Sequence, residues 1–472
     1  MRRALPAAVA LAVGAALALP AAAFAHGLVG KQDLPIPRWL FAWAAAVVLV
    51  VSFVALASLW PRPRLEQARE RPVLRVPAAL EALCGAVGIA AFIATVWAGF
   101  AGSQTATANL APTVVFVVFW VAIPFATLLV GDVFSAFNPW RALARATAWA
   151  FGRVGGGAPA PLAYPTWLGR WPAALGILAF AWVELVYVNR DDPSTLAVLA
   201  LLYAAVQLVG MSLYGIEPWT RNADAFAVYF RLFSMLSPLH WRERALYTRP
   251  PLSGAPRLDP TPGTVALLCV MIGTVSFDGL SQGQLWTGSD GIAPDLQQRF
   301  INVGFSAETA LELAFTIGLL VMVALVASVY RIGVVGMRSV GHGHGATELS
   351  RRFVHSLIPI ALAYVIAHYF SLLTYQGQAM AFLVSDPLGD GSNIFGTATA
   401  TIDYNIVGAN GVWYVQVFAL VLGHASGLTL AHDRALVVYD RVREATRSQY
   451  WMLAVMVGFT CLGLWLLSAA AQ

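Results

Sequence analysis

The chain has 472 residues, of which 59% are hydrophobic and only 11% are charged, and its mean hydropathy is +0.69. A soluble domain carries about 25% charged residues, so this composition excludes a soluble globular enzyme and also a disordered or coiled-coil chain. The formal net charge of +5 would suggest nucleic-acid binding in a soluble protein. In a membrane chain it reflects arginines in cytoplasmic loops, so we expect no nucleic-acid partner.

Residues 1–25 have the pattern of a secretory signal peptide, with two arginines near the start, an Ala/Leu-rich segment and an A-x-A site that ends at Ala25. Cleavage there leaves His26 as the mature N-terminus, outside the cytoplasm. An uncleaved first anchor helix is the alternative. Pro6 and Pro20 leave the apolar segment short for a membrane span, which favours cleavage.

Residues 26–472 are expected to form one all-α, polytopic membrane domain of ten helices, because a span needs about 20 mostly apolar residues. Continuous apolar runs of that length also exclude a membrane β-barrel, which shows short alternating segments. The expected spans are 39–60, 78–100, 111–131, 171–189, 195–214, 262–280, 310–330, 353–375, 412–431 and 450–469.

The basic residues predict the orientation of these spans. The loops expected in the cytoplasm hold 23 arginines, whereas the outer loops hold four basic residues. This asymmetry places both mature termini outside the cytoplasm. The preference for arginine over lysine suggests a GC-rich bacterial genome, so we expect the bacterial inner membrane, with the lipid bilayer as the main partner.

Four connecting segments stand out. The outer loops 281–309 and 376–411 are acidic and long, and loops of that length usually cap or bind something. The inner segments 131–150 and 215–258 mix aromatic residues with arginine. We expect these two to contain helices lying in the inner membrane interface.

Four ionisable residues are expected in the outer half of the membrane: Glu184, Asp278, Glu312 and His368. Charged groups within a span cost several kcal/mol and by default indicate function. We assign these four as candidate catalytic residues. Each also has a structural interpretation, since a buried histidine often bridges helices and a carboxylate near a helix end often caps it.

The eighth span carries a polar stripe. Tyr364, His368, Ser371 and Tyr375 are spaced 4-3-4, which puts them on one helix face. A polar stripe on an apolar helix must face protein or a wet cavity. We therefore assign Tyr364, Ser371 and Tyr375 to substrate binding, together with His424 on the ninth span. No spacing identifies a metal site, so a divalent metal ion stays open.

Four segments carry a family resemblance: HGLVGKQDLPIPRWLFAW, GDVFSAFNPWRA, FVHSLIPIALAYVIAHYFSLLTYQGQ and GHASGLTLAHDRAL. They resemble a bacterial, largely actinobacterial, family of multi-pass membrane proteins named fenitrothion hydrolases, which are membrane-bound organophosphorus hydrolases. The resemblance implies hydrolysis of an aryl phosphorothioate triester, a small apolar substrate. It supplies no catalytic residues.

Three functions remain open at this point. The first is a hydrolase with an outward-facing polar pocket in the membrane, where His368 or Glu184 activates water. The second is a proton-coupled transporter, because buried Glu, Asp and His suit a carrier equally well. The third is a haem or copper protein that uses His368 and His424 as ligands.

Overall fold

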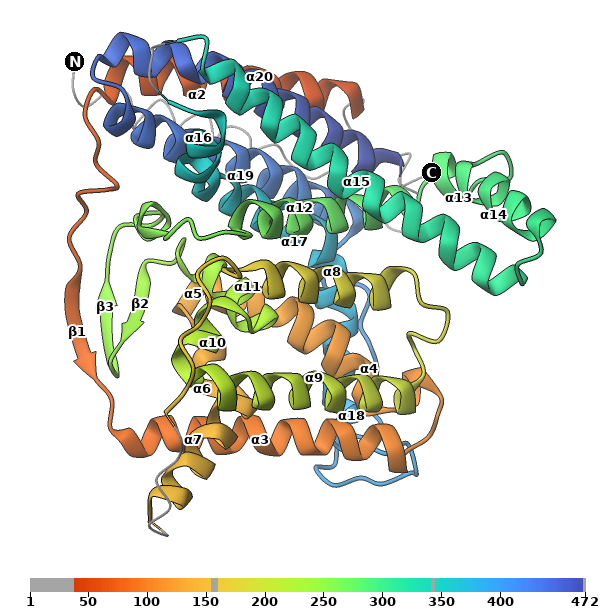
Figure 1. Cartoon of the computed structure of the whole chain (residues 1–472). Coiled ribbons are helices and arrows are strands. Elements are labelled where there is room, and N and C mark those ends of the chain that lie inside the picture. The colour runs from red at the N-terminus through yellow and green to blue at the C-terminus, as the bar shows by residue number, and fades with distance from the viewer. Residues whose placement is uncertain (1–37, 154–159, 341–343, 470–472) are drawn as a thin grey trace. The chain divides into compact units, whose positions relative to one another are not determined.

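The computed structural model describes residues 38–153, 160–340 and 344–469. The expected signal peptide lies outside the described residues. Helices make up most of the described chain (Figure 1). The long ones, in chain order, are α2 (Arg38–Leu59), α3 (Ala78–Ala101), α4 (Leu110–Thr113) continued by the π-helix η2 (Val114–Ala122) and α5 (Ile123–Val130), α8 (Trp171–Leu185), α9 (Pro193–Tyr214), α12 (Thr264–Ser281), α15 (Ala307–Met337), α17 (Ile358–Gln376), α19 (Ala409–Val438) and α20 (Val442–Ala469).

Shorter elements connect these helices. The short α-helices are α6 (Val133–Phe137), α7 (Pro139–Arg153), α10 (Ile216–Asn222), α11 (Ala225–Ser234), α13 (Gln284–Thr287), α14 (Ile292–Val303), α16 (Ala346–Phe353) and α18 (Met380–Leu383). The 3-10 turns are η1 (Ala106–Ala108), η3 (Ala255–Arg257), η4 (Val354–Leu357) and η5 (Gly377–Ala379). Both expected inner segments contain such short helices, and the outer loop 281–309 contains two.

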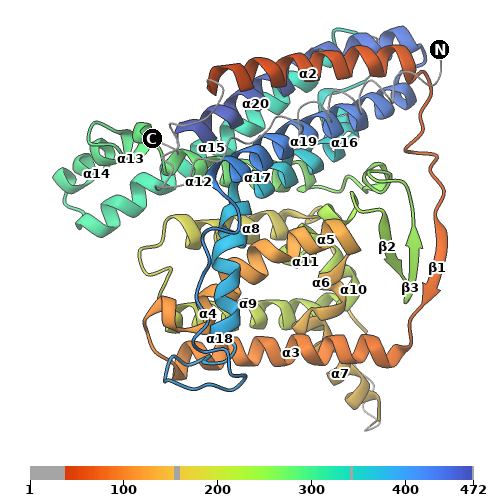
Figure 2. The same ribbon diagram turned by 180° about the vertical axis from the view of Figure 1, so that it is seen from behind.

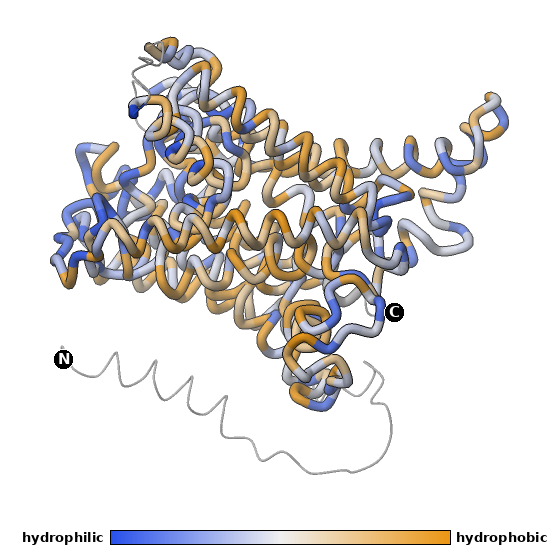
Figure 3. The backbone as a smooth tube through the Cα atoms, turned by 90° about the horizontal axis from the view of Figure 1, so that it is seen from below, coloured by the Kyte–Doolittle hydropathy of each residue, from blue (hydrophilic) through white to orange (hydrophobic). Residues whose placement is uncertain are grey.

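Eight helices of the described chain are long and apolar enough to cross a membrane. They correspond to eight of the ten expected spans. The other two, 39–60 and 171–189, are apolar helices that fall short of that length, counted from Trp43 to Leu59 and from Trp171 to Leu185. Hydrophobic stretches fill the middle of the helices and hydrophilic stretches gather towards their ends (Figure 3). The chain is therefore a multi-pass helical membrane protein.

The long helices pack in two groups that meet at α8, α12 and α17. In one group α19 packs against α17, α20 and α2, and α15 packs against α12 and α20. In the other, α3 packs against α9 and α7, and α11 packs against α8 and α5. Figure 2 shows α17 running from the first group past α8, towards α18 and α4. Helix α12, which contacts both α8 and α17, is the most buried of the spans.

A close helix crossing explains part of the GHASGLTLAHDRAL segment. Added Cβ atoms at Gly423 and Gly427 would lie 2.8 Å from the backbone carbonyl oxygens of Pro359 and Ser356. Only glycine allows α19 and α17 to approach this closely, as small residues do at membrane helix crossings.

Asp433, near the end of the same segment, holds the loop that follows α2. Asp433 is fully buried and accepts hydrogen bonds from the Trp60 indole at 2.8 Å and from the backbone N–H groups of Arg64, Leu65 and Glu66 at 2.6–3.2 Å. A buried carboxylate satisfied in this way fixes the chain that follows α2.

A small sheet was not expected from the sequence. Strands β1 (Arg71–Arg75), β2 (Leu239–Arg242) and β3 (Ala245–Thr248) form an antiparallel sheet in the order β1-β3-β2. Strand β1 comes from the connection between α2 and α3, so the sheet joins two connecting segments that are far apart in sequence. Such pairing leaves little trace in a local pattern, because each strand has only four or five residues.

Helix α11 differs from the expected interfacial helix in the segment 215–258. Nine of its ten residues are buried, all except Arg231. Its aromatic side chains pack against α5, η2 and α8; for example, the ring of Phe226 lies 4.6 Å from that of Phe119. The aromatic residues that suggested headgroup contact therefore form protein core.

Candidate functional site

Asp278 and His368 form the centre of a polar cluster between the spanning helices. Nε2 of His368, on α17, lies 2.8 Å from Oδ2 of Asp278, near the end of α12. A carboxylate at this distance fixes the orientation of an imidazole and holds a proton on the nitrogen that faces it. Sequence spacing could not show this pairing, because the two residues are 90 positions apart.

Tyr369 extends the cluster to a second carboxyl group. Its hydroxyl donates to Oδ2 of Asp278 at 2.9 Å and lies 3.2 Å from Oε1 of Glu184, on α8. A single hydroxyl proton points at one carboxyl group at a time, so both contacts are strong together only when Glu184 carries a proton. The four side chains form one hydrogen-bonded chain from α17 through α12 to α8.

Burial differs along this chain. The Asp278 side chain is 9% exposed, whereas the His368 side chain is 21% exposed. Nδ1 of His368 has no hydrogen-bond partner among the residues that the structure describes. Asp278 thus holds one nitrogen of an imidazole whose side chain is partly exposed.

Aromatic residues enclose the Glu184 end. Trp120 lies in the π-helix η2 and stacks on Tyr229 of α11, with ring centroids 4.9 Å apart at 18°. Short π-helical segments are rare and often occur at functional sites. Within the described residues, the buried Trp120 indole N–H and the Tyr229 hydroxyl make no hydrogen bond of good geometry, although the indole lies against Glu184 and Tyr369. Buried donors of this kind call for an explanation, and both lie beside the cluster.

Glu312, the fourth candidate catalytic residue, lies apart from this cluster. Its Oε1 accepts a hydrogen bond from the backbone N–H of Val188, just beyond the end of α8, at 3.2 Å. It does not cap its own helix, because Ser306 occupies that position. Glu312 therefore joins α15 to the outer end of α8.

The polar side chains of the α17 stripe have separate partners and do not form one site. Tyr364 donates to the carbonyl of Phe459, on α20, at 3.0 Å, and Tyr375 donates to the carbonyl of Val407 at 2.6 Å. Ser371 is half-buried and makes no hydrogen bond to another side chain in the described part of the chain. Of the stripe, only His368 belongs to the polar cluster.

His424 is separate as well. It is fully buried, and its Nδ1 lies 2.8 Å from the carbonyl oxygen of Leu420 in its own helix. Among the described residues, no group of three or more His, Cys, Asp or Glu side chains is placed to hold a metal ion. His424 hydrogen-bonds within its own helix, whereas His368 pairs with Asp278 on α12.

Sequence reasoning missed Tyr369, Trp120 and Tyr229. Tyr369 follows His368 directly, so on a helix it points about 100° away from the stripe. Trp120 lies in an apolar run without charged residues, and Tyr229 lies in a segment assigned to the membrane interface. The available signal was a tyrosine adjacent to a histidine within a span, which is weak on its own.

No family model matches the chain, and no curated protein or solved structure matches it. The functional argument therefore rests on the site itself.

Proposed function

We propose that the chain is a membrane-embedded hydrolase in which His368 acts as general base. The observation that carries the proposal is the Asp278–His368 pair, with one imidazole nitrogen held by the carboxylate and the side chain still 21% exposed. A histidine oriented in this way can take a proton from water at neutral pH.

The substrate class follows from the surroundings of the cluster and from the family resemblance. The walls near Glu184 are aromatic, with the Trp120 and Phe180 rings 4.7 Å apart. The N–H and O–H groups of Trp120 and Tyr229, which make no hydrogen bond of good geometry in the described chain, are suited to donate to a phosphoryl oxygen, whose charge grows during attack by water. An apolar aryl phosphotriester would reach such a site from the bilayer. These features support the organophosphorus hydrolase activity that the resemblance implies.

The direct test is turnover by the purified protein in phosphatidylcholine vesicles, with a 4-nitrophenyl dialkyl phosphate as substrate. We expect release of nitrophenolate in proportion to the amount of protein, at a rate above that of empty vesicles. Chelator-treated protein is assayed in parallel, to show whether turnover depends on a divalent metal ion. Rates equal to those of empty vesicles, for both the phosphate and the phosphorothioate ester, would refute the proposal.

Proton-coupled transport is the second candidate, and one specific observation favours it. The chain His368–Asp278–Tyr369–Glu184 joins the helices α17, α12 and α8 by contacts of 2.8, 2.9 and 3.2 Å. Such a chain can pass a proton between helices that move relative to one another. Vesicles with an internal pH dye and a non-hydrolysable analogue of the ester separate the two candidates, because a proton-coupled carrier still acidifies them whereas a hydrolase releases no acid from the analogue.

We propose ten spans in the bacterial inner membrane, with both mature termini outside. This arrangement puts the outer loop 376–411 and the inner segment 331–352 on opposite sides. In a background without Cys84, Cys269 and Cys461, we expect an impermeant thiol reagent to label Thr399→Cys in intact cells and to label Ser339→Cys only after permeabilisation. Both positions are exposed, so a difference reports sidedness. If the reagent labels only Ser339→Cys in intact cells, the orientation is opposite to the one proposed.

A further inference from the structure

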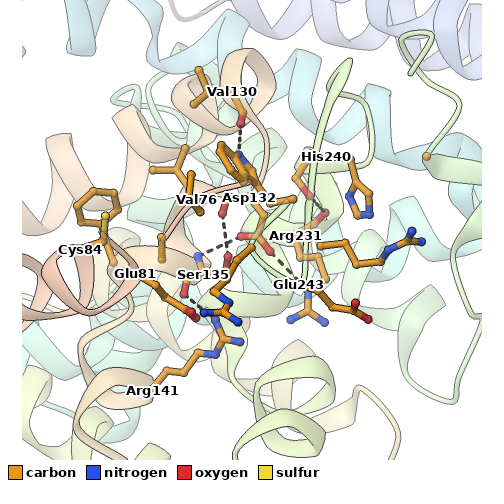
Figure 4. Close-up of a pocket in the computed structure, with 18 of the residues that line it drawn as sticks. Val76, Glu81, Cys84, Val130, Asp132, Ser135, Arg141, Arg231, His240 and Glu243 are labelled. Carbon is orange, nitrogen blue, oxygen red and sulfur yellow. Dashed lines mark hydrogen bonds and ion pairs between the residues drawn. The ribbon is translucent and has the colours of Figure 1, made fainter. Parts of the chain in front are cut away.

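A large pocket lies away from the polar cluster, among the inner segments. It has a volume of about 1170 Å³. Its walls come from the start of α3, the segment around α6 and α7, helices α10 and α11, and the β2–β3 hairpin (Figure 4). Nothing in the proposed hydrolase or transporter mechanism uses this pocket.

The pocket carries an excess of positive charge. Eight arginines and five carboxylates line it. The arginines are Arg141, Arg145, Arg221, Arg231, Arg242, Arg244, Arg249 and Arg257. The carboxylates are Glu70, Glu81, Asp132, Glu217 and Glu243. Like charges gathered in a concave, partly dry site raise the local concentration of oppositely charged ions.

Most of the excess surrounds Glu70. This carboxylate, 10% exposed, forms an ion pair with Arg257 and lies 3.6 Å from Arg249 and 3.9 Å from Arg242. One negative charge thus faces three positive charges. Burial lowers the pKa of Arg249, while the nearby Glu70 carboxylate acts in the opposite direction.

The backbone near these arginines has a close contact at Gly254 and a strained hairpin turn. A Cβ on Gly254 would lie 2.4–2.5 Å from the Arg249 guanidinium, so only glycine leaves room for that side chain. The hairpin turn places Glu243 and Arg244 at φ values of 49° and 62°. A left-handed conformation is unfavourable for such residues, and a two-residue hairpin turn usually has Asn or Gly there. Strain of this kind is often retained at binding sites.

The opposite wall adds further donors. Arg141 and Arg145 share Glu217 at 2.9 Å each, and Arg145 also pairs with Glu81. Nε of Arg141 is buried without a hydrogen-bond partner, and Arg221 forms no ion pair, both within the part of the chain that the structure describes. This wall therefore keeps N–H groups that are free to donate to an anion bound in the pocket.

Apolar side chains complete the lining. Val76, Leu80 and Cys84, at the start of spanning helix α3, line the pocket together with Trp241 and Met235. Leu80 is also exposed on the outside of the helix. A ligand can thus place its anionic group among the arginines and an apolar part along α3.

We infer that this pocket binds a phosphate-bearing anion, either the headgroup of an anionic phospholipid or a small soluble phosphate. Guanidinium groups bind phosphate through paired, charge-assisted hydrogen bonds. Basic pockets beside spanning helices on the cytoplasmic side are suited to lipid headgroups. The inference does not depend on the hydrolase proposal.

The test measures the melting temperature of the purified full chain in two arms. In detergent, inorganic phosphate is titrated against chloride at equal ionic strength. In nanodiscs, phosphatidylcholine alone is compared with phosphatidylcholine that contains phosphatidylglycerol. A higher melting temperature with phosphate indicates a soluble ligand, and a higher one only with phosphatidylglycerol indicates a lipid headgroup.

The pocket variant is Arg221→Gln/Arg242→Gln, because both side chains are exposed and the ion pair of Arg242 with Glu70 is long, at 3.9 Å. The matched control, Arg299→Gln/Arg441→Gln, removes two exposed arginines outside the pocket. Each lost charge-assisted contact is expected to weaken binding about tenfold, so the pocket variant should lose the stabilisation and the control should keep it. No stabilisation in either arm, or equal stabilisation in both variants, would overturn the inference.

Discussion

The His368→Gln variant is expected to lower kcat for an aryl phosphotriester by ~10²–10⁴, the usual loss for a general base. Glutamine can still donate to Asp278 but cannot take up a proton near neutral pH. The melting temperature of the His368→Gln variant in detergent should therefore stay close to that of the wild type. Turnover and melting temperature are measured on the same preparation, in phosphatidylcholine vesicles and in detergent respectively.

Two companion variants separate catalysis from structure. His368→Leu removes the donor that faces Asp278 and leaves a buried carboxylate with one partner fewer, so it should lower the melting temperature as well as the rate. His344→Gln, in an inner loop beside Glu348, changes a histidine outside the polar cluster and should leave both unchanged. Normal turnover by His368→Gln at wild-type expression would eliminate the catalytic role.

The same variant also bears on transport. If protons pass along the chain from His368 to Glu184, His368→Gln should abolish substrate-dependent acidification of vesicles. Tyr369→Phe then becomes informative, because it removes the hydroxyl that joins the two carboxyl groups and leaves the Asp278–His368 pair intact. A hydrolase should tolerate that change better than a proton carrier does.

Much of the fold follows from the sequence, because spanning helices are encoded locally. Apolar runs mark where spanning helices occur, and eight of the expected spans match apolar helices long enough to cross a membrane. The sheet could not be found in this way, since β1 pairs with β3 across about 170 residues of chain. The burial of α11 was hidden for a similar reason, because its core contacts come from helices elsewhere.

The candidate site was predictable in part. Depth in the membrane suggested that Glu184, Asp278 and His368 lie in one layer, and these three do belong to one hydrogen-bonded chain. Depth alone cannot give the direction of a side chain around its helix. Glu312 lies near the same outer region but turns towards the end of α8, and the tyrosine that completes the chain was overlooked.

A large loss of stability is expected for Asp224→Ala. Asp224 is fully buried and caps α11. Its Oδ2 accepts from Asn138 at 3.0 Å and from Trp140 at 2.7 Å, while its Oδ1 accepts from Tyr203 at 2.9 Å and from the N–H of Ala227 at 3.1 Å. Alanine would leave four buried donors without an acceptor. We expect a decrease of about 4 kcal/mol in the free energy of unfolding.

The matched control is Asp192→Ala. Asp192 also caps a helix, α9, and accepts from Ser194 and Thr195 at 2.6–2.9 Å. It is only half-buried, so water can replace the lost acceptor and the expected decrease is about 1 kcal/mol, as for an ordinary N-cap. Unfolding in mixed detergent micelles measures the free energy of unfolding of both variants.

Since α11 carries Tyr229 to the side of the polar cluster, Asp224→Ala should also reduce turnover, whereas Asp192→Ala should not. If the two variants have equal free energies of unfolding, the burial of Asp224 adds nothing to what a half-buried cap contributes.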